Sequence, residues 1–336
     1  MQNLRRISWQ VVLSIAVVCL LAASAVGHPG SGILVDRLGQ VYFIDTGSGL
    51  WKIDARGGVS HLSPLRNHWL AMDPNDRFTQ SRVPTDPGRD WVITPAGSNP
   101  TILISTDFSL VIGEDGNLYH PSARESNVRI LRSSPEGRTS TFVTLPRSVA
   151  GEALGWINGL ATGPNGSIYY TEDNAVRRIT AKGAVSTIAT VTALTGRPAT
   201  PGSEERPYLR GLKVDGNGTV YVADAADARV FKITPDGKVT TVLQLESPWA
   251  PTDVAIFGDL VYVLEYSHTP GDDRLEWMPR VRKMTADGKS TIILTVDQMP
   301  GARASKPSAS LSYNYLSVEF FDLLLRSLLL FGPRSV

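Results

Sequence analysis

The sequence predicts an all-β fold, a six-bladed β-propeller in which each blade is a four-stranded sheet. The first observation behind this prediction is a phrase that recurs about every 40 residues, seen most clearly in residues 211–240. The second is its pattern, since each copy holds four short runs that alternate apolar and polar residues, as half-buried strands do. The third is the Asp, Asn and Gly residues between the runs, which are typical of tight turns.

The copies of the phrase align on a tyrosine in the second strand of each blade. These tyrosines are Tyr42, Tyr119, Tyr169, Tyr221 and Tyr262. Each copy reads as strand, tight turn, strand, loop, strand, glycine turn and strand, so the aligned copies account for five blades. A β-sandwich is the alternative fold, but a sandwich has no reason to repeat a whole four-strand phrase.

The remaining blade fills the gap after the first copy. Residues 68–73 begin like a first strand, and residues 91–97 end like a third strand with its turn. The stretch between them, residues 74–90, is polar and carries three prolines, so we expect this blade to be irregular. Residues 32–296 then hold six blades, with almost no helix outside the two ends of the chain.

Composition excludes several other classes of protein. The 336 residues carry a formal net charge of +1, with acidic and basic residues interspersed, so no basic surface for nucleic acid is expected. Cys19 is the only cysteine, and an intramolecular disulfide is therefore impossible. Stability must come from the packing of sheets.

The first residues of the chain have the three parts of an export signal. Arg5 and Arg6 form a positive start, residues 11–21 form an apolar core, and residues 23–27 offer small residues for cleavage. We therefore expect a signal peptide over residues 1–27, a propeller over residues 28–298, and a periplasmic or secreted protein. An uncleaved anchor helix is the alternative.

After the propeller, residues 299–336 are expected to form a linker and an apolar tail. Residues 316–331 are strongly apolar but include Glu319, Asp322 and Arg326, which would share one helix face. These charges and the short run argue against a membrane span. An amphipathic helix that docks on a blade or on a membrane surface, and a tail without fixed structure, both stay open.

The phrases at residues 158–179 and 211–238 resemble the NHL repeat. Residues 32–296, about four fifths of the chain, also resemble the six-bladed propellers of the SMP-30/gluconolactonase family. The resemblance implies the propeller fold, and it implies a lactonase activity that uses a divalent metal at the central mouth. The glycines and alternating strands that carry it are structural features.

The metal ligands of that family match this chain only in part. Asn158, in Asn-Gly-Leu-Ala, matches one ligand phrase, whereas Ser31 stands where the family has a glutamate and Arg210 where it has an aspartate. A cation in place of an anionic ligand would repel a metal. We therefore expect no cofactor and no tightly bound divalent metal, and the histidines show no zinc spacing.

Propeller geometry predicts where a binding site would lie. The residues just before each innermost strand should meet at one mouth of the axial channel, and they include His68, Asn158 and Arg210, with Asp107 beside this set. The second strands end in carboxylates at the same register, namely Asp45, Glu172, Asp224 and Glu265. The alternative role for these carboxylates is to accept backbone N–H groups of the following loops.

We interpret the chain as an exported propeller that binds a small polar or anionic organic ligand, or a protein partner, at this mouth. The alternative is a lactonase-like hydrolase or lyase in which His68 acts as general base, oriented by Asp107 or Glu265; a scaffold that binds protein through its blade edges is a third reading. For an anionic ligand, Arg210→Ala should weaken binding by about 2–5 kcal/mol. Lys213 is expected to have little part in it.

Overall fold

A computed structural model describes most of the repeat region. The described residues are 32–65, 67–78, 91–93, 101–105, 108–124, 127–145, 157–172, 175–190, 193–194, 196, 209–267, 278–285 and 288–300. The expected signal peptide (residues 1–27) lies outside them, as does the expected linker and apolar tail (residues 299–336) except for its first two residues. Asp107 and Ser31 also lie outside them.

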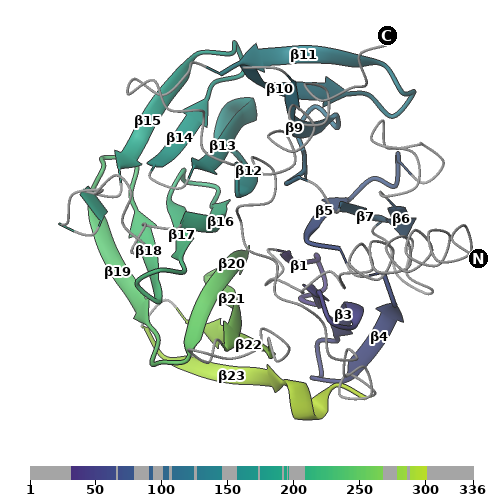
Figure 1. The fold of residues 1–336 in the computed structure, drawn as a ribbon, viewed down its shortest axis with the longest axis vertical. Coiled ribbons are helices and arrows are strands. Elements are labelled where there is room, and N and C mark those ends of the chain that lie inside the picture. Colours follow the sequence, from purple (N-terminus) through teal and green to yellow (C-terminus); the bar gives the residue numbers. More distant parts are fainter. Residues whose placement is uncertain are drawn as a thin grey trace, which may run out of the picture. The chain divides into compact units, whose positions relative to one another are not determined.

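Within these residues the chain forms five four-stranded antiparallel sheets and one three-stranded sheet (Figure 1). The first sheet comprises β1 (Ile33–Val35), β2 (Val41–Asp45), β3 (Gly49–Ile53) and β4 (Val59–Ser63). The second comprises β5 (Trp69–Asp73), β6 (Trp91–Ile93) and β7 (Thr101–Ser105). The third comprises β8 (Val111–Ile112), β9 (Leu118–Arg124), β10 (Asn127–Ser133) and β11 (Thr139–Thr144).

The second half of the chain contributes three further sheets of the same kind. The fourth comprises β12 (Gly159–Gly163), β13 (Ser167–Glu172), β14 (Ala175–Ile179) and β15 (Val185–Thr190). The fifth comprises β16 (Leu209–Val214), β17 (Val220–Asp224), β18 (Arg229–Ile233) and β19 (Val239–Gln244). The sixth comprises β20 (Trp249–Phe257), β21 (Leu260–Ser267), β22 (Pro279–Met284) and β23 (Ser290–Thr295).

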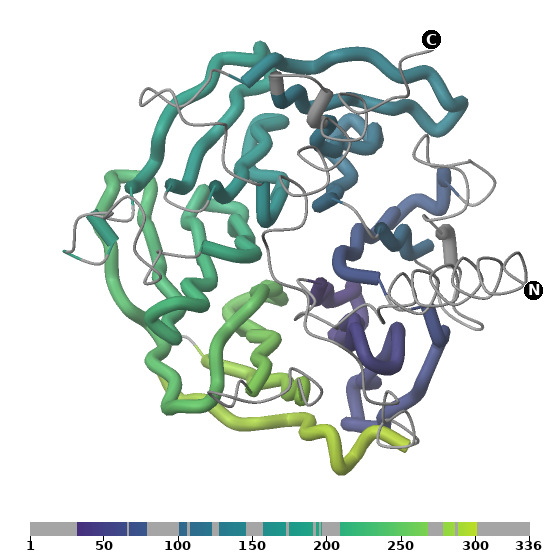
Figure 2. Tube along the Cα trace, in the orientation of Figure 1, coloured from purple at the N-terminus to yellow at the C-terminus, as the bar shows by residue number. Residues whose placement is uncertain are grey.

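The innermost strands of the six sheets follow one another around a central axis. Contacts join β1 to β5, β5 to β8, β8 to β12, β12 to β16, β16 to β20, and β20 back to β1 (Figure 2). The chain is thus an all-β propeller, and the predicted four-strand blade is present in five of its sheets.

The second sheet differs from the prediction of four strands taken in chain order. Its order is β5-β7-β6, so Thr101–Ser105 lies between Trp69–Asp73 and Trp91–Ile93. The physical reason is burial: all five residues of β7 are buried, and a strand of this kind belongs in the interior of a sheet. Trp91–Ile93 keeps the third position from the axis that the sequence predicts, but the chain then returns inward.

A tight turn with an Asp-Gly pattern joins the first strand of a sheet to the second. In the fifth sheet, Asp215 Oδ1 accepts hydrogen bonds from the backbone N–H groups of Asn217 and Thr219, both at 2.9 Å. Gly218 closes the turn with φ of +84°, a value that side chains disfavour. The aspartate and the glycine therefore form the tight turn that the sequence predicts here.

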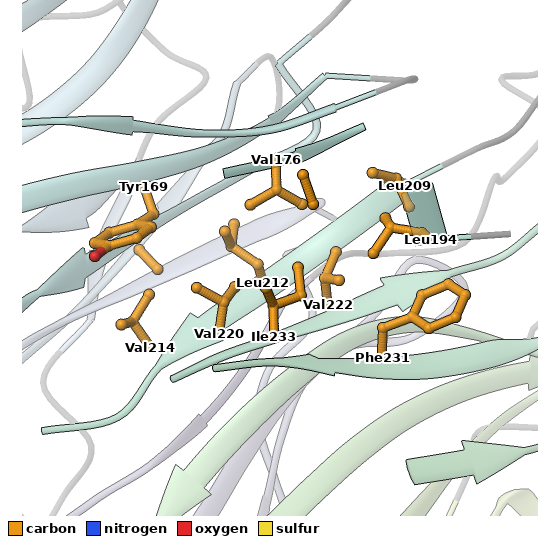
Figure 3. Packing of buried hydrophobic residues seen from close by; sticks show 12 residues of the cluster. Tyr169, Val176, Leu194, Leu209, Leu212, Val214, Val220, Val222, Phe231 and Ile233 are labelled. Carbon is orange, nitrogen blue, oxygen red and sulfur yellow. The ribbon is translucent and has the colours of Figure 1, made fainter. Parts of the chain in front are cut away.

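The core consists of separate layers, each between neighbouring sheets. Figure 3 shows one such layer, in which Val176 and Tyr169 of the fourth sheet pack with Leu212, Val222 and Phe231 of the fifth. Each sheet thus buries both faces against its neighbours, which is why blade strands such as β2 are buried at every position.

Helices are few and short in the described residues. Two 3-10 turns occur, η1 (Pro164–Gly166) and η3 (Val296–Gln298). None of the helices among these residues is long and apolar enough to cross a membrane.

Candidate functional site

A cavity of about 230 Å³ lies along the axis, between the innermost strands. Residues of all six sheets line it, so it is enclosed by the ring of strands and not by a single loop. Most of the lining is apolar, including Leu70, Met72, Val111, Leu160 and Leu212. A concave, largely apolar space with a few polar groups is the usual form of a small-molecule site.

Lys213 and Asp253 supply the two charged side chains among the described lining residues. They lie on the adjacent strands β16 and β20. Both are half-buried. The site therefore places one acid and one base in the same apolar wall.

Asp253 is held in place by the backbone. Its Oδ1 accepts from the N–H of Val254 at 2.8 Å, and its Oδ2 accepts from the N–H of Ile33 at 3.1 Å. The second bond joins the last sheet to the first. Gly211 allows this position, since a Cβ on residue 211 would stand 1.9 Å from Asp253 Oδ1.

Burial shifts the pKa values of both groups toward their neutral forms. Burial raises the pKa of Asp253 to about 7, although its two backbone donors and the charge of Lys213 act to lower it. Burial lowers the pKa of Lys213, and the charge of Asp253 acts in the opposite direction. An acid and an amine that both titrate closer to neutrality than usual are common in functional sites.

Ser109 and Thr162 are the hydroxyl-bearing residues among the described lining residues. Ser109 is 1% exposed, and its Oγ has no hydrogen-bond partner among the described residues. Because that Oγ is itself buried, it is not counted among the groups that could contact a ligand.

The predicted strand-start residues lie next in sequence to lining residues but are themselves outside the lining. His68, Asn158 and Arg210 directly precede Trp69, Gly159 and Gly211, which line the cavity. The backbone N–H of His68 donates to Ser105 O at 3.0 Å, which continues the β5–β7 ladder. The ligand-binding role of these three residues stays a prediction.

Asn158 links three sheets through hydrogen bonds. Its side-chain Nδ2 donates to Leu209 O at 2.7 Å, and its backbone oxygen accepts from Trp69 Nε1 at 3.0 Å. Thr171 Oγ1 in turn donates to Arg210 O. Around Asn158, therefore, buried polar groups join the second, fourth and fifth sheets.

The carboxylates at the ends of the second strands are buried and engaged by nearby groups. Glu172 pairs with Arg177 Nε at 2.8 Å. Glu265 pairs with Arg282 Nε at 2.6 Å and also with Arg280. Asp45 accepts from the backbone N–H of Gly47 at 3.2 Å.

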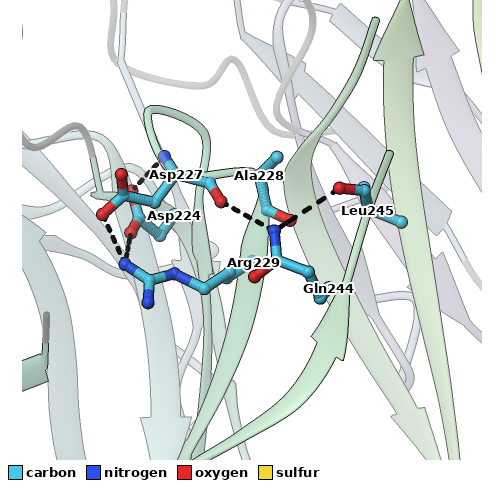
Figure 4. Close-up of polar contacts among 6 residues, drawn as sticks. All are labelled: Asp224, Asp227, Ala228, Arg229, Gln244 and Leu245. Carbon is cyan, nitrogen blue, oxygen red and sulfur yellow. Dashed lines mark hydrogen bonds and ion pairs between the residues drawn. The ribbon is translucent and has the colours of Figure 1, made fainter. Parts of the chain in front are cut away.

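Asp224 is the least completely satisfied of these carboxylates. Its Oδ1 accepts from the N–H of Asp227 at 3.3 Å, whereas Arg229 Nη2 lies 3.8 Å from its Oδ2 and also pairs with Asp227 (Figure 4). Burial raises the pKa of Asp224 to about 6, and Asp227 adds to this shift. Glu172, Asp224 and Glu265 thus have structural partners, and their predicted contact with ligand stays a prediction.

Of the three positions where the family has metal ligands, the structure describes Asn158 and Arg210. Asn158 uses its amide to hold Leu209, and Arg210 brings a cation instead of a carboxylate. The described residues contain no cluster of three or more His, Cys, Asp or Glu side chains with metal-binding geometry. Metal dependence is thus a question for elemental analysis.

Sequence reasoning missed Lys213, although the repeat carries a signal for it. Lys213 pairs with Tyr221, and the positions equivalent to Lys213 in other sheets pair with the equivalent tyrosines. Those positions hold Leu34, Ala161 and Ala255. The sequence signal is therefore a lysine at a position where these other copies of the repeat have an apolar residue.

The comparison with protein families finds one partial match. The family model of the SMP-30/gluconolactonase/LRE-like region matches residues 148–262, which are 115 of the 336 residues. No curated protein matches the chain.

Several solved structures are similar in fold. Virginiamycin B lyase from Staphylococcus aureus is 15% identical with a TM-score of 0.44, over 80% of this chain and 85% of that one. A calcium-binding regucalcin from Agrobacterium tumefaciens is 15% identical with a TM-score of 0.48, over 73% and 84%. A luciferin-regenerating enzyme is 16% identical with a TM-score of 0.48, over 75% and 90%. Over residues 148–262 the chain is therefore similar to the SMP-30/gluconolactonase/LRE-like region, and its own sheets form a β-propeller.

Proposed function

We propose that this propeller binds a small polar organic ligand in its axial cavity, with Lys213 as the main polar contact. The observation that carries the proposal is the position of Lys213 in the wall of a cavity enclosed by all six innermost strands. Its amino group has three hydrogens to donate when protonated and calls for an acceptor such as a carboxylate or a carbonyl oxygen.

The size and lining of the cavity support a small ligand with an apolar part. At about 230 Å³ the cavity is smaller than the usual pocket for a drug-sized molecule. Leu70, Met72 and Leu160 would contact the apolar part, while Asp253 offers a carboxyl group. Short aliphatic acids and related compounds fit this description.

The binding test uses thermal stabilisation by a series of short carboxylates, from acetate to hexanoate. We expect at least one of them to raise the Tm of the wild-type protein. Lys213→Met should weaken this ligand at least tenfold, about 1.4 kcal/mol. Lys238→Met is the matched control, because Lys238 is exposed on the turn between β18 and β19.

The same assay separates the cavity from the strand-start residues. If Arg210→Ala abolishes the shift while Lys213→Met keeps it, the ligand is held at the rim and the cavity proposal is wrong. If none of the carboxylates from acetate to hexanoate raises the Tm, the proposal of a small-acid ligand is also wrong.

The lactonase-like hydrolase or lyase is the second candidate function, favoured by the position of Asp253. Its pKa of about 7 is suited to donating and accepting protons near neutrality. Hydrolysis of short lactones that is lost in Asp253→Asn, at unchanged stability, would support this candidate.

We also propose that the protein is exported to the periplasm or secreted. The support is the charged, apolar and small-residue order of residues 5–27. Sequencing of the mature N-terminus from a secreting host should begin between residues 24 and 30. A start at Met1 in membrane fractions would favour the anchor helix.

A further inference from the structure

Lys213 is an amine without a close partner in an apolar wall. In the part of the chain that the structure describes, it makes no hydrogen bond and no ion pair within 4 Å; its electrostatic interaction is with Asp253. Burial lowers the pKa of Lys213, so a larger fraction of it is neutral amine near neutral pH. Desolvation in an apolar pocket is one way in which proteins activate a lysine as a nucleophile.

Asp253 stands on the neighbouring strand with its carboxyl group fixed by two backbone N–H groups. Since burial raises the pKa of Asp253 to about 7, it holds a proton in part of the molecules near neutral pH. An amine, and an acid that can give and take back a proton, are the groups that imine formation with a carbonyl compound requires.

We propose that Lys213 forms a reversible imine with a small aldehyde or ketone that enters the cavity, and that Asp253 delivers and recovers the proton. This inference rests on the proposed binding function and names the class of ligand. Neither charged group matches the family's metal positions, so the chemistry is separate from metal-assisted hydrolysis.

The reaction balances with these groups alone. Neutral Lys213 Nζ attacks the carbonyl carbon, the C=O π electrons move to oxygen, and that oxygen takes the proton of protonated Asp253. The positively charged nitrogen then loses a proton to the Asp253 carboxylate, which gives a neutral carbinolamine and restores the acid. Protonated Asp253 then gives its proton to the carbinolamine hydroxyl, the C–O bond breaks and water leaves. The nitrogen lone pair forms C=N, which leaves an iminium ion beside the Asp253 carboxylate.

The test is reductive trapping with butyraldehyde and sodium cyanoborohydride, followed by intact mass and peptide mapping. We expect one butyl group on Lys213 and a labelling rate at neutral pH at least tenfold above that of Lys238. Lys213→Arg keeps a cation but removes the nucleophile and should lose this label. Asp253→Asn should slow the labelling of Lys213 and leave that of Lys238 unchanged.

Butyrate provides the second readout, because it can bind but cannot form an imine. If butyrate raises the Tm of wild type and Lys213→Arg, while wild type labels Lys213 no faster than Lys238, imine formation is wrong and ligand binding stands. If neither butyrate nor butyraldehyde has an effect, both proposals fail. Equal labelling in Lys213→Arg would place the reactive amine elsewhere and also overturn the inference.

Discussion

At the scale of single residues, the raised pKa of Asp253 links its protonation to folding. Its value in the folded protein, about 7, is above the ordinary value of 3.8. Between these values the folded state binds more protons than the unfolded state, so the free energy of unfolding falls as the pH rises through this range. The stability that Asp253 contributes is therefore present at low pH and lost toward pH 7.

Asp253→Asn should remove this pH dependence. Between about pH 4 and pH 7, the free energy of unfolding should fall by on the order of 2–4 kcal/mol more in the wild-type protein than in Asp253→Asn. Urea denaturation across that range measures it. Asp236→Asn, at an exposed carboxyl whose pKa is lowered, is the control and should keep the wild-type slope in this range. Parallel profiles for wild type and Asp253→Asn would contradict the assignment.

Glu265 tests whether the buried carboxylates have a structural role. Glu265→Gln leaves Arg280 and Arg282 without their shared anion in a buried setting, so it should destabilise the protein by about 3 kcal/mol. Urea denaturation measures the change. Glu136→Gln breaks an exposed pair with Arg138 at 3.5 Å and should change little. If Glu265→Gln leaves stability unchanged but alters ligand binding, Glu265 belongs to the predicted mouth site.

At the scale of strands and sheets, the sequence predicts what depends on local chemistry. Turns such as 215–218 are determined by one aspartate and one glycine a few residues apart, and the strands by alternation. Sheet order is different, because it depends on which strand is buried deepest. Thr101–Ser105 follows the predicted third strand in the sequence but takes the second position in its sheet.

The sequence predicts less of the axial cavity than of the fold, for a similar reason. The sequence identifies strand starts such as Asn158, and these do join neighbouring sheets. Lys213 lies within a strand, where alternation alone cannot tell a solvent-facing lysine from one that faces an axial cavity. Its environment depends on β20, whose first residues lie well beyond it in the chain.

Gly211 tests the close approach of β16 and β20. In Gly211→Ala the new Cβ would overlap Asp253 Oδ1, so either the carboxylate or the strand must move. We expect a loss of about 1–3 kcal/mol in stability, the range for overpacking, and weaker binding of any cavity ligand. Thermal unfolding and the carboxylate assay measure both.

The control for this change is Gly216→Ala in the neighbouring turn, where the added Cβ would meet no atom within 4 Å. It should leave ligand binding unchanged. If Gly211→Ala behaves like Gly216→Ala in both assays, Asp253 does not pack over Gly211 in solution.

At the scale of the whole propeller, the first and last sheets close the ring. Phe43 and Trp51 of the first sheet share a buried cluster with Leu264 and Val281 of the last. The Ile33–Asp253 hydrogen bond makes the same connection at the cavity. Because each sheet packs on two neighbours, the cavity keeps its walls only while the ring is closed, and binding should be linked to global stability.

Tyr266→Phe tests this closure with the loss of one hydroxyl group. The hydroxyl is buried and donates to Ile44 O at 2.7 Å, across the junction of the last and first sheets. Its removal leaves a carbonyl with one acceptor site unfilled and should cost about 1–3 kcal/mol. We expect the Tm to fall in a single transition seen alike by far-UV circular dichroism and tryptophan fluorescence. Tyr221→Phe, at a half-buried ring next to Lys232, is the control and should leave the Tm nearly unchanged. Two separate transitions, or an unchanged Tm in Tyr266→Phe, would show that the junction does not hold the sheets together.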